Sequence, residues 1–231
     1  MRDEAGDLRR RVADSRRAGR AYLRSQPPAA RTRMATYFTA NTHFGDARIL
    51  RQRRRFASVE EHDETLIRHW NTVIGPGDAV WHLGDFAAGA SRARCREIFA
   101  RLNGVKRLVR GNHDTNRVLT LPWAEPPTES YRLNLPAADG SACRLFLAHY
   151  AHRAWPGLWR GTRHLYGHTH GTIPDTTRSC DVGVDAWDDR PVGIAALVAR
   201  QRAATLVPDE LRRDAGVEPG SRRDLSLNRD D

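Results

Sequence analysis

The amino-acid sequence predicts an α/β protein, and two patterns carry that prediction. Between residues 34 and 109, short apolar segments with strand character alternate with amphipathic segments of helical period. This alternation is typical of a parallel sheet whose strands are joined by right-handed helical crossovers. Polar clusters rich in His, Asp and Asn follow directly after the apolar segments. With 231 residues, 39% of them hydrophobic and 29% charged, the chain is long enough to bury one sizeable core.

The first strand is expected at residues 34–40 and is followed by a helix with a clear start signal. Ser58 and Glu61 form a capping box, which satisfies backbone N–H groups at the start of a helix. Leu66 and Trp70 share one face of this helix because they are four residues apart. The Gly-Pro-Gly-Asp run at 75–78 ends the helix.

The same strand and helix order then repeats. Residues 79–83 are the second expected strand, Ser91 caps a second helix, and residues 105–109 are the third strand. The apolar residues of the second helix follow the helical period: Cys95, Ile98, Phe99 and Leu102. The first sheet is therefore expected to be largely parallel.

The second half of the chain is predicted to be mostly strands joined by Gly, Pro and Asp turns. The expected strands lie at 130–135, 143–148, 163–167 and 180–184. A closing helix is expected over 193–204, behind Pro191.

Composition divides the chain into three expected regions. An Arg-rich arm at 1–33, expected to be flexible, precedes a domain at 34–206, and a disordered tail follows at 207–231. Their formal net charges are +6, +6 and −2. Of the 38 basic residues only Lys106 is a lysine, which indicates an Arg-rich coding bias more than recognition chemistry. Nucleic acid is therefore an alternative partner and not the favoured one.

The composition also favours a cytoplasmic protein with no membrane partner. No segment approaches the roughly 20 consecutive apolar residues of a membrane span, and residues 1–33 lack the apolar core of a signal peptide. Cys95, Cys143 and Cys180 are widely spaced and odd in number, so we expect reduced thiols.

The polar clusters after the predicted strands carry the chemistry. Carboxyl ends of parallel strands are where ligands bind in open α/β sheets. His, Asp and Asn suit divalent transition metals, and a pair of such ions assists phosphoryl displacement. The clusters are Asn41-Thr42-His43, Gly84-Asp85, Gly111-Asn112-His113-Asp114, His149 and Gly167-His168-Thr169-His170. Five other histidines are expected to be structural: His62, His69, His82, His152 and His164.

In this order the clusters resemble the calcineurin-like metallophosphoesterase superfamily, whose pattern runs Asp-x-His, Gly-Asp, Gly-Asn-His-Asp/Glu, His and Gly-His-x-His. The match extends through 34–206, and segments 39–45 and 182–187 look like a group of small bacterial phosphoesterases. The resemblance implies a four-layer αββα sandwich, in which two mixed β-sheets are flanked by helices and a dinuclear metal site lies at the sheet edge.

The resemblance also implies a set of metal ligands in which Asp85 bridges two ions. The first ion would be held by Asn41, His43, Asp85 and His170, and the second by Asp85, Asn112, His149 and His168. We expect two divalent ions, with manganese favoured and iron, zinc, cobalt or nickel as alternatives.

The same resemblance gives the catalytic roles. A hydroxide bridging the two ions would be the nucleophile. His113 would protonate the leaving oxygen as general acid, and Asp114 would fix the His113 ring.

One position departs from the family pattern, because the expected aspartate is Asn41. With Asp85 as the only carboxylate ligand, two divalent ions keep more positive charge, which weakens retention of the first ion and strengthens its pull on phosphate oxygens. Asp46 is a candidate to supply the missing negative charge by contacting a metal ligand instead of the metal itself.

We therefore expect a metal-dependent phosphoesterase. Phosphodiesters are favoured because His113 can protonate a poor alkoxide leaving group, and the substrate is expected to be a small molecule or nucleotide. Arg110, Arg153 and Arg163 lie near the motifs and are candidate phosphate-binding residues.

Two alternatives stay open. The basic charge suggests a nuclease acting on single-stranded DNA or RNA. Asn41 suggests a non-catalytic scaffold or binding protein built on a degenerate phosphoesterase site. No oligomeric state is predicted.

Overall fold

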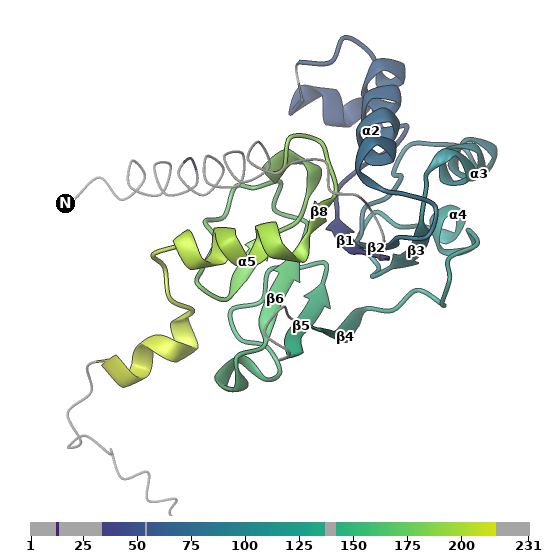
Figure 1. The fold of residues 1–231 in the computed structure, drawn as a ribbon. Coiled ribbons are helices and arrows are strands. Elements are labelled where there is room, and N and C mark those ends of the chain that lie inside the picture. The colour runs from purple at the N-terminus through teal and green to yellow at the C-terminus, as the bar shows by residue number, and fades with distance from the viewer. Residues whose placement is uncertain (1–12, 14–33, 54, 137–141, 216–231) are drawn as a thin grey trace, which may run out of the picture.

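The computed structural model describes residues 34–53, 55–136 and 142–215, together with Ala13 (Figure 1). The rest of the predicted N-terminal arm lies outside the described residues. The described residues form two four-stranded sheets, with strand orders β3-β2-β1-β8 and β4-β5-β6-β7. Each sheet combines parallel pairs with one antiparallel pair. The predicted α/β class, with two mixed sheets flanked by helices, is confirmed.

The first sheet contains the three parallel strands that the sequence predicts. These are β1 (Thr36–Thr39), β2 (Ala79–His82) and β3 (Val105–Leu108), each within two residues of its expected bounds. A fourth strand, β8 (Val192–Gly193), pairs antiparallel with β1. The sequence did not indicate β8, because two residues are too few to show an alternating pattern.

Three helices cover the outer face of the first sheet: α2 (Val59–Val73), α3 (Arg92–Arg101) and α4 (Asn116–Leu119). The Ser58 hydroxyl accepts from the backbone N–H of Glu61, and Ser91 accepts from Arg94, so both expected helix caps are confirmed. The core beneath these helices contains buried residues from the sheet and the helices, among them Val80, Leu108, Leu66, Trp70, Ile98 and Phe99.

The second sheet is built from β4 (Ser130–Pro136), β5 (Ala142–Ala148), β6 (Arg163–Tyr166) and β7 (Ser179–Asp181). The predicted strand at 180–184 ends early, because Asp181 accepts a hydrogen bond of 2.6 Å from the backbone N–H of Gly183 and so turns the chain. A short 3-10 helix, η3 (Val184–Ala186), follows.

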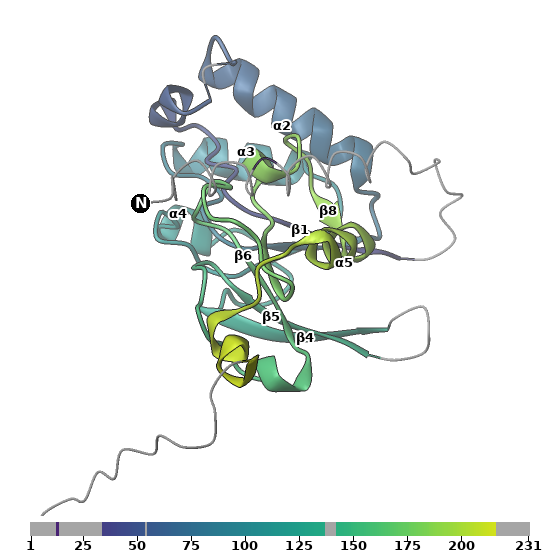
Figure 2. The same cartoon turned by 90° about the vertical axis from the view of Figure 1, so that its left-hand side faces the viewer.

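The two sheets pack face to face around a second apolar core. Phe38, Trp81 and Leu83 from the first sheet meet Leu145, Leu147 and Leu165 from the second. Figure 2 shows these layers edge-on, with α2 and α3 on one side of the first sheet and the second sheet on the other. Helix α5 (Ile194–Ala203) lies at the edge, against β7, β8 and β1.

The outer face of the second sheet is covered by short 3-10 helices. These are η2 (Leu158–Arg160) and η4 (Asp209–Ala215), seen below the sheet in Figure 2. Leu211 of η4 packs against an apolar cluster that includes Phe146 and Trp155. Helix η4 lies within the tail 207–231 that was expected to be disordered. Asp209 of η4 also pairs with Arg153 at 2.8 Å, so η4 contacts the rest of the domain. Residues 216–231 lie outside the described part.

A bilayer crossing needs a helix of about 20 mostly apolar residues. None of the helices in the described part of the chain has the length and apolar character that such a crossing needs.

Candidate metal centre

The loops that follow four strands meet at one edge of the two sheets. The backbone N–H of Asn41, after β1, donates to Gly84 O at 3.0 Å, and that of His43 donates to Asp85 O at 3.0 Å. The N–H of Gly167, after β6, donates to His149 O, after β5, at 2.9 Å. These bonds join neighbouring loops within each sheet, and the backbone N–H of His168, after β6, joins the two sheets by donating to Oδ1 of Asn41, after β1, at 2.9 Å. The clusters therefore lie together at this edge, as the sequence predicted.

Two glycines allow this close approach. Gly84 has φ +91°, and a Cβ there would lie 2.4 Å from Nδ1 of His149. A Cβ on Gly111 would lie 2.4 Å from the backbone N of Asp85. Both positions therefore require glycine, because any side chain would push the loops apart.

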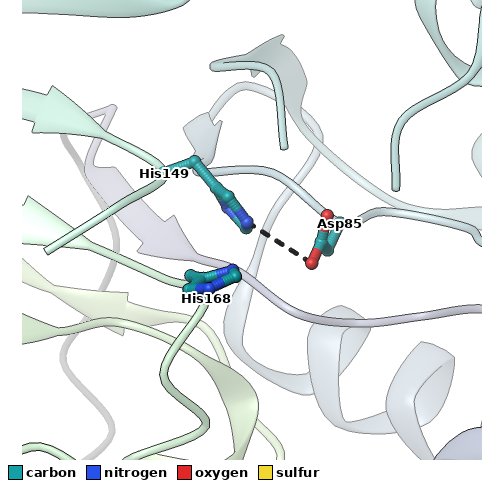
Figure 3. A group of neighbouring side chains, drawn as sticks. All are labelled: Asp85, His149 and His168. Carbon is teal, nitrogen blue, oxygen red and sulfur yellow. Dashed lines mark ion pairs between the residues drawn. The ribbon is translucent and has the colours of Figure 1, made fainter. Parts of the chain in front are cut away.

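Asp85, His149 and His168 converge from three different loops (Figure 3). Each offers a ligand atom, and these atoms all lie within 4.8 Å of one another. Nε2 of His149 is 3.4 Å from Oδ2 of Asp85. Oδ1 of Asn112 lies 3.0 Å from Nε2 of His149 and 3.0 Å from Nδ1 of His168. We call Asp85, Asn112, His149 and His168 the His149 half of the centre.

A hydrogen bond fixes which nitrogen of His149 faces this group. Nδ1 lies 2.7 Å from Leu83 O, which can only accept, so Nδ1 carries a proton. Burial lowers the pKa of His149. Its hydrogen bond to Asp85 and the charge of that carboxylate raise the pKa by more, so the net pKa lies above its usual value. A proton on Nε2 would occupy the place where a cation would bind, so metal binding would release it.

The second part of the centre consists of Asn41, His43 and His170, with Asp85 shared, and we call it the His43 half. Nε2 of His43 lies 3.5 Å from Oδ2 of Asp85. The His43 ring stacks on the His170 ring, with centroids 5.2 Å apart. The close group of donor atoms around Asp85 includes neither of these two histidines, so this half is the looser one.

His43 is unusual because it is 4% exposed, yet neither ring nitrogen has a hydrogen-bond partner. Burial lowers its pKa to about 3, so the ring is neutral and keeps a lone pair. Buried polar atoms in proteins are normally satisfied, and an orphaned imidazole nitrogen beside a carboxylate needs an explanation. A cation between His43 and Asp85 would supply one.

The tautomer of His170 is set by Asp185. Nδ1 of His170 lies 2.8 Å from Oδ2 of Asp185, so the proton is on Nδ1 and the lone pair on Nε2. Asp185 also receives two hydrogen bonds, of 2.8 and 2.6 Å, from the buried Arg53. A carboxylate behind a histidine is a common feature of metal sites, where it orients the ring.

The backbone at the centre is strained. Seven non-glycine residues of the described chain have positive φ, and five of them are candidate ligands: Asn41, His43, Asp85, His168 and His170. Such conformations cost about 1–3 kcal/mol each and gather at functional sites, where the surrounding structure holds them. The loops therefore keep the ligand side chains in place at the expense of stability.

The donor atoms of both halves fit divalent cations, but the His43 half has the amide of Asn41 where the metallophosphoesterase pattern has a carboxylate. The His149 half offers one carboxylate, one amide oxygen and two imidazoles, which suit a transition metal. In the His43 half, Oδ1 of Asn41 accepts from the backbone N–H of His168 at 2.9 Å, and Nδ2 is buried without a partner. The backbone hydrogen bond fixes the orientation of the amide, because Nδ2 could not accept it.

Relatives of this chain are found among bacteriophage proteins. The gene 66 protein of Mycobacterium phage L5 is 28% identical over 210 residues, which cover 79% of this chain and 98% of the phage protein. The gene 66 protein of Mycobacterium phage D29 is 32% identical over 179 residues, which cover 66% of this chain and 89% of that protein. The chain belongs to the family of these gene 66 proteins. No family model matches it.

This gene 66 family member also resembles two other proteins, one over a shorter stretch of sequence and one in fold. The uncharacterized protein MJ1445 of Methanocaldococcus jannaschii is 41% identical over 80 residues, 34% of this chain and 46% of that protein. The solved structure of AQ665, a protein of unknown function from Aquifex aeolicus, matches with a TM-score of 0.55 at 20% identity. It covers 71% of this chain and 98% of AQ665, and it bears on the fold alone.

His113 and Asp114 lie beside the candidate ligands, but Asp114 has a different contact from the one expected. The exposed His113 ring lies 5.4 Å from the His43 ring, centroid to centroid. Asp114 was expected to fix the His113 ring. Its two oxygens instead accept from the backbone N–H groups of Asp85, Phe86 and Gly111 at 2.8–2.9 Å. Asp114 therefore holds two ligand loops together, and burial raises its pKa to about 6.

The three candidate phosphate-binding arginines have other partners. Arg110 pairs with Glu129 at 3.3 Å, and the exposed Arg153 pairs with Asp209 at 2.8 Å. Arg163 begins β6, at the opposite end of that strand from the centre, and donates to Oε1 of Gln201 at 2.6 Å. The structure does not bring Arg153 or Arg163 to the candidate ligands.

Asp46, the candidate for a missing carboxylate, lies behind His43. Its Oδ2 is 4.0 Å from Nδ1 of His43, beyond hydrogen-bond distance. Both oxygens of Asp46 accept from Arg48 instead, and the pKa of Asp46 is lowered by these bonds although burial opposes the shift.

The sequence analysis did not predict a functional role for three residues that lie at the centre. Arg53 and Asp185 are 132 residues apart and form an ion pair that only the fold reveals. Tyr150 is 51% exposed, and its ring centroid lies 4.6 Å from that of His168. The position of Tyr150 directly after His149 was the available signal.

Proposed function

We propose that this protein is a metal-dependent phosphoesterase of the calcineurin-like superfamily, with a four-layer αββα sandwich and a dinuclear centre formed by the His149 half and the His43 half. The observation that supports it most is the position of one atom. Oδ2 of Asp85 lies 3.4 Å from Nε2 of His149 and 3.5 Å from Nε2 of His43. A single carboxylate oxygen between two histidines of different loops is the arrangement that a bridging ligand requires.

Asp85 is held in this orientation by the loop that follows β3. Its other oxygen, Oδ1, accepts from the backbone N–H of His113 at 2.9 Å. Burial raises the pKa of Asp85, but the hydrogen bond and charge of His149 and the amide of His113 lower it more, so the net pKa is below the usual range. Asp85 is therefore a carboxylate at neutral pH, ready to bind cations.

Two divalent cations at this position would lower the pKa of a water molecule to about 7 and stabilise negative charge on phosphate oxygens. His43, His149, His168 and His170 would hold these cations through neutral nitrogens, with Asn41 and Asn112 as amide ligands. His113 is exposed beside the His43 ring, where it can reach the leaving oxygen of a bound ester and donate a proton. We favour phosphodiesters for this reason.

The test is hydrolysis of bis-p-nitrophenyl phosphate and p-nitrophenyl phosphate by purified protein, after chelation and after addition of Mn²⁺, Fe²⁺, Zn²⁺, Co²⁺ or Ni²⁺. We expect metal-dependent turnover with the diester favoured. His113→Ala should lower kcat by about 100- to 10,000-fold while metal content is unchanged. His152→Ala is the matched control, because His152 is exposed and lies outside the ligand set.

Wild-type protein that holds well under one ion per chain and stays inactive with every metal would contradict the proposal. Such a result would favour a non-catalytic binding protein, for which Asn41 is the supporting residue. Release of nucleotides from single-stranded DNA without turnover of either small ester would favour a nuclease.

A further inference from the structure

A cleft lies away from the candidate metal centre, on the outer face of the second sheet. It has a volume of about 680 Å³ and is lined by β4, β5, the segment 155–162 and Glu210. This volume is within the range of about 300–1,000 Å³ that is typical of small-ligand sites. No residue of either half of the candidate metal centre lines it.

The alternation of β4 explains the chemistry of this cleft. Tyr131, Leu133 and Leu135 pack towards the core between the sheets, so Arg132 and Asn134 point outwards. In the antiparallel register, Asn134 lies opposite Arg144 of β5, and Arg132 lies opposite Phe146. The two arginines therefore project from the same face of the sheet, on neighbouring strands.

The cleft carries an excess of positive charge. Its lining contains Arg132, Arg144 and Arg160, and Glu210 is its one carboxylate. Among the described residues, no carboxylate forms an ion pair with any of these three arginines, and Arg144 donates instead to the backbone oxygen of Arg160. Other exposed arginines do have acidic partners: Arg94 pairs with Glu97, Arg101 with Glu64 and Arg107 with Glu125. Three arginines around one cleft, with no acidic partner in the described part of the chain, offer a site for an anion.

Two tryptophans give the cleft an aromatic surface. Trp155 is buried at the cleft floor, and its Nε1 donates to Thr162 O at 2.9 Å. Trp159 is 57% exposed, and its Nε1 donates to Oε1 of Glu210 at 3.1 Å, which holds the indole at the rim. An exposed, oriented indole beside guanidinium groups is the combination that binds unstacked bases on a phosphate backbone.

We propose that this cleft binds single-stranded nucleic acid, with the three arginines contacting phosphates and Trp159 stacking on a base. Arg132 lies opposite Phe146, three residues before His149 along β5. At about 3.3 Å per residue, the cleft and the candidate metal centre are about 10 Å apart along this strand. The inference does not rest on the proposed phosphoesterase activity, because it uses none of the candidate ligands.

The experiment measures binding of a fluorescein-labelled oligothymidine by anisotropy over a series of salt concentrations. The test variant is the triple Arg132→Ala, Arg144→Ala, Arg160→Ala. We expect its Kd to rise more than about tenfold, and the slope of log K against log salt to fall by about 2, because each phosphate contact on a single strand contributes about 0.7. All three side chains are exposed, so the variant should fold, and circular dichroism and thermal melting check this.

A matched triple controls for net charge. Arg68→Ala, Arg92→Ala, Arg96→Ala removes the same charge from exposed positions on α2 and α3, on the far side of the other sheet. We expect less than about a twofold change in Kd, because charges that far away are screened at physiological salt.

The indole is tested separately. Trp159→Ala should weaken binding about 5- to 100-fold, and Trp159→Phe should retain most of the affinity, because stacking on an aromatic side chain is worth about 1–3 kcal/mol per base. Duplex DNA and inorganic polyphosphate serve as competitors, and both should compete poorly.

Three results would overturn the inference. The cleft triple could bind oligothymidine with wild-type affinity and salt slope. The two triples could weaken binding equally, which would assign it to net charge alone. Polyphosphate could compete as well as oligothymidine while Trp159→Ala has no effect, which would make the cleft a site for polyanions in general.

Discussion

The two halves of the candidate metal centre differ in how their polar atoms are satisfied. In the His149 half, the donor atoms contact one another, as in the 3.0 Å contacts of Asn112 with His149 and His168. In the His43 half, both nitrogens of the buried His43 lack partners, and position 41 is an amide. The His149 half is therefore held by its own hydrogen bonds, whereas the His43 half depends on what binds to it.

One ion should therefore bind more tightly than the other. Both halves share the carboxylate of Asp85, which lies 3.4 Å from His149 and 3.5 Å from His43. They differ in how closely the other donor atoms gather, because ligand atoms of Asp85, His149 and His168 all lie within 4.8 Å of one another and neither His43 nor His170 joins this group. Because a site whose ligand atoms already converge binds an ion at less cost of rearrangement, the ion in the His43 half should be the weaker of the two. The following experiments test this comparison.

The largest effect is expected from Asp85→Asn, because Asp85 belongs to both halves. The substitution removes the only carboxylate among the candidate ligands, so both metal affinities should fall and the hydrolytic rate should drop by about 1,000-fold or more. Elemental analysis of the purified variant and assay with the diester check this. Full metal content in Asp85→Asn would refute a shared ligand.

Removal of one histidine from each half should separate the two ions. His149→Ala should lower the affinity of the tight ion by at least about 100-fold, which is the upper end of the effect for residues that only orient a ligand. His43→Ala should leave the tight ion bound and abolish the weak one. Isothermal titration with Mn²⁺ measures both, and identical losses in the two variants would mean that the halves are not distinct.

Asp185→Asn tests how the His43 half is oriented. The carboxylate of Asp185 holds the proton of His170 at 2.8 Å, so the amide should lower the affinity of the weak ion by about 10- to 100-fold. The tight ion should be unaffected. Asp189→Asn is a control, because Asp189 contacts Arg55 outside the centre. If the two variants behave alike, Asp185 has no special role.

Asn41→Asp should strengthen the weak ion by about tenfold, because a negative charge replaces a neutral amide beside the cation. The affinity of the tight ion should change little. Titration with Mn²⁺ after chelation provides the measurement. An unchanged affinity for the weak ion would show that residue 41 does not govern its retention.

The pH dependence of metal binding should also differ between the two halves. The pKa of His149 is raised above 6.5 mainly by Asp85, in spite of burial, so protons compete with the tight ion and its affinity should fall up to about tenfold per pH unit below that pKa. Burial lowers the pKa of His43 to about 3, so this ligand needs no deprotonation between pH 5 and 8. Metal titrations between pH 5 and 8 measure both affinities. If the affinity of the tight ion did not change with pH, the predicted difference between the two halves would be contradicted.

Much of the fold could be predicted from the sequence because its signals are local. The caps at Ser58 and Ser91 and the apolar period of each helix mark α2 and α3. The two-residue β8 and the 3-10 helix η4 carry no such period. The pairing of β8 with β1 and the contact of Leu211 with Phe146 depend on tertiary packing.

The same distinction applies to the candidate centre. Clusters such as Gly84-Asp85 stand directly after strands, so their convergence could be predicted from strand order. The Arg53–Asp185 pair and the contacts of Asp114 with backbone amides could not, because they join residues that are distant in the chain or not distinctive in type. Arg163 was misassigned because nearness in sequence to a motif does not fix the end of the strand on which a residue lies.

Electron paramagnetic resonance of the protein loaded with two equivalents of Mn²⁺ tests directly whether Asp85 is shared by two ions. Two ions bridged by Asp85, about 3.5–4 Å apart as in other two-metal sites, should give the signal of a spin-coupled manganese pair, and Asp85→Asn should abolish it. A six-line signal of isolated Mn²⁺ at every loading, the same in wild type and variant, would contradict a dinuclear centre at Asp85.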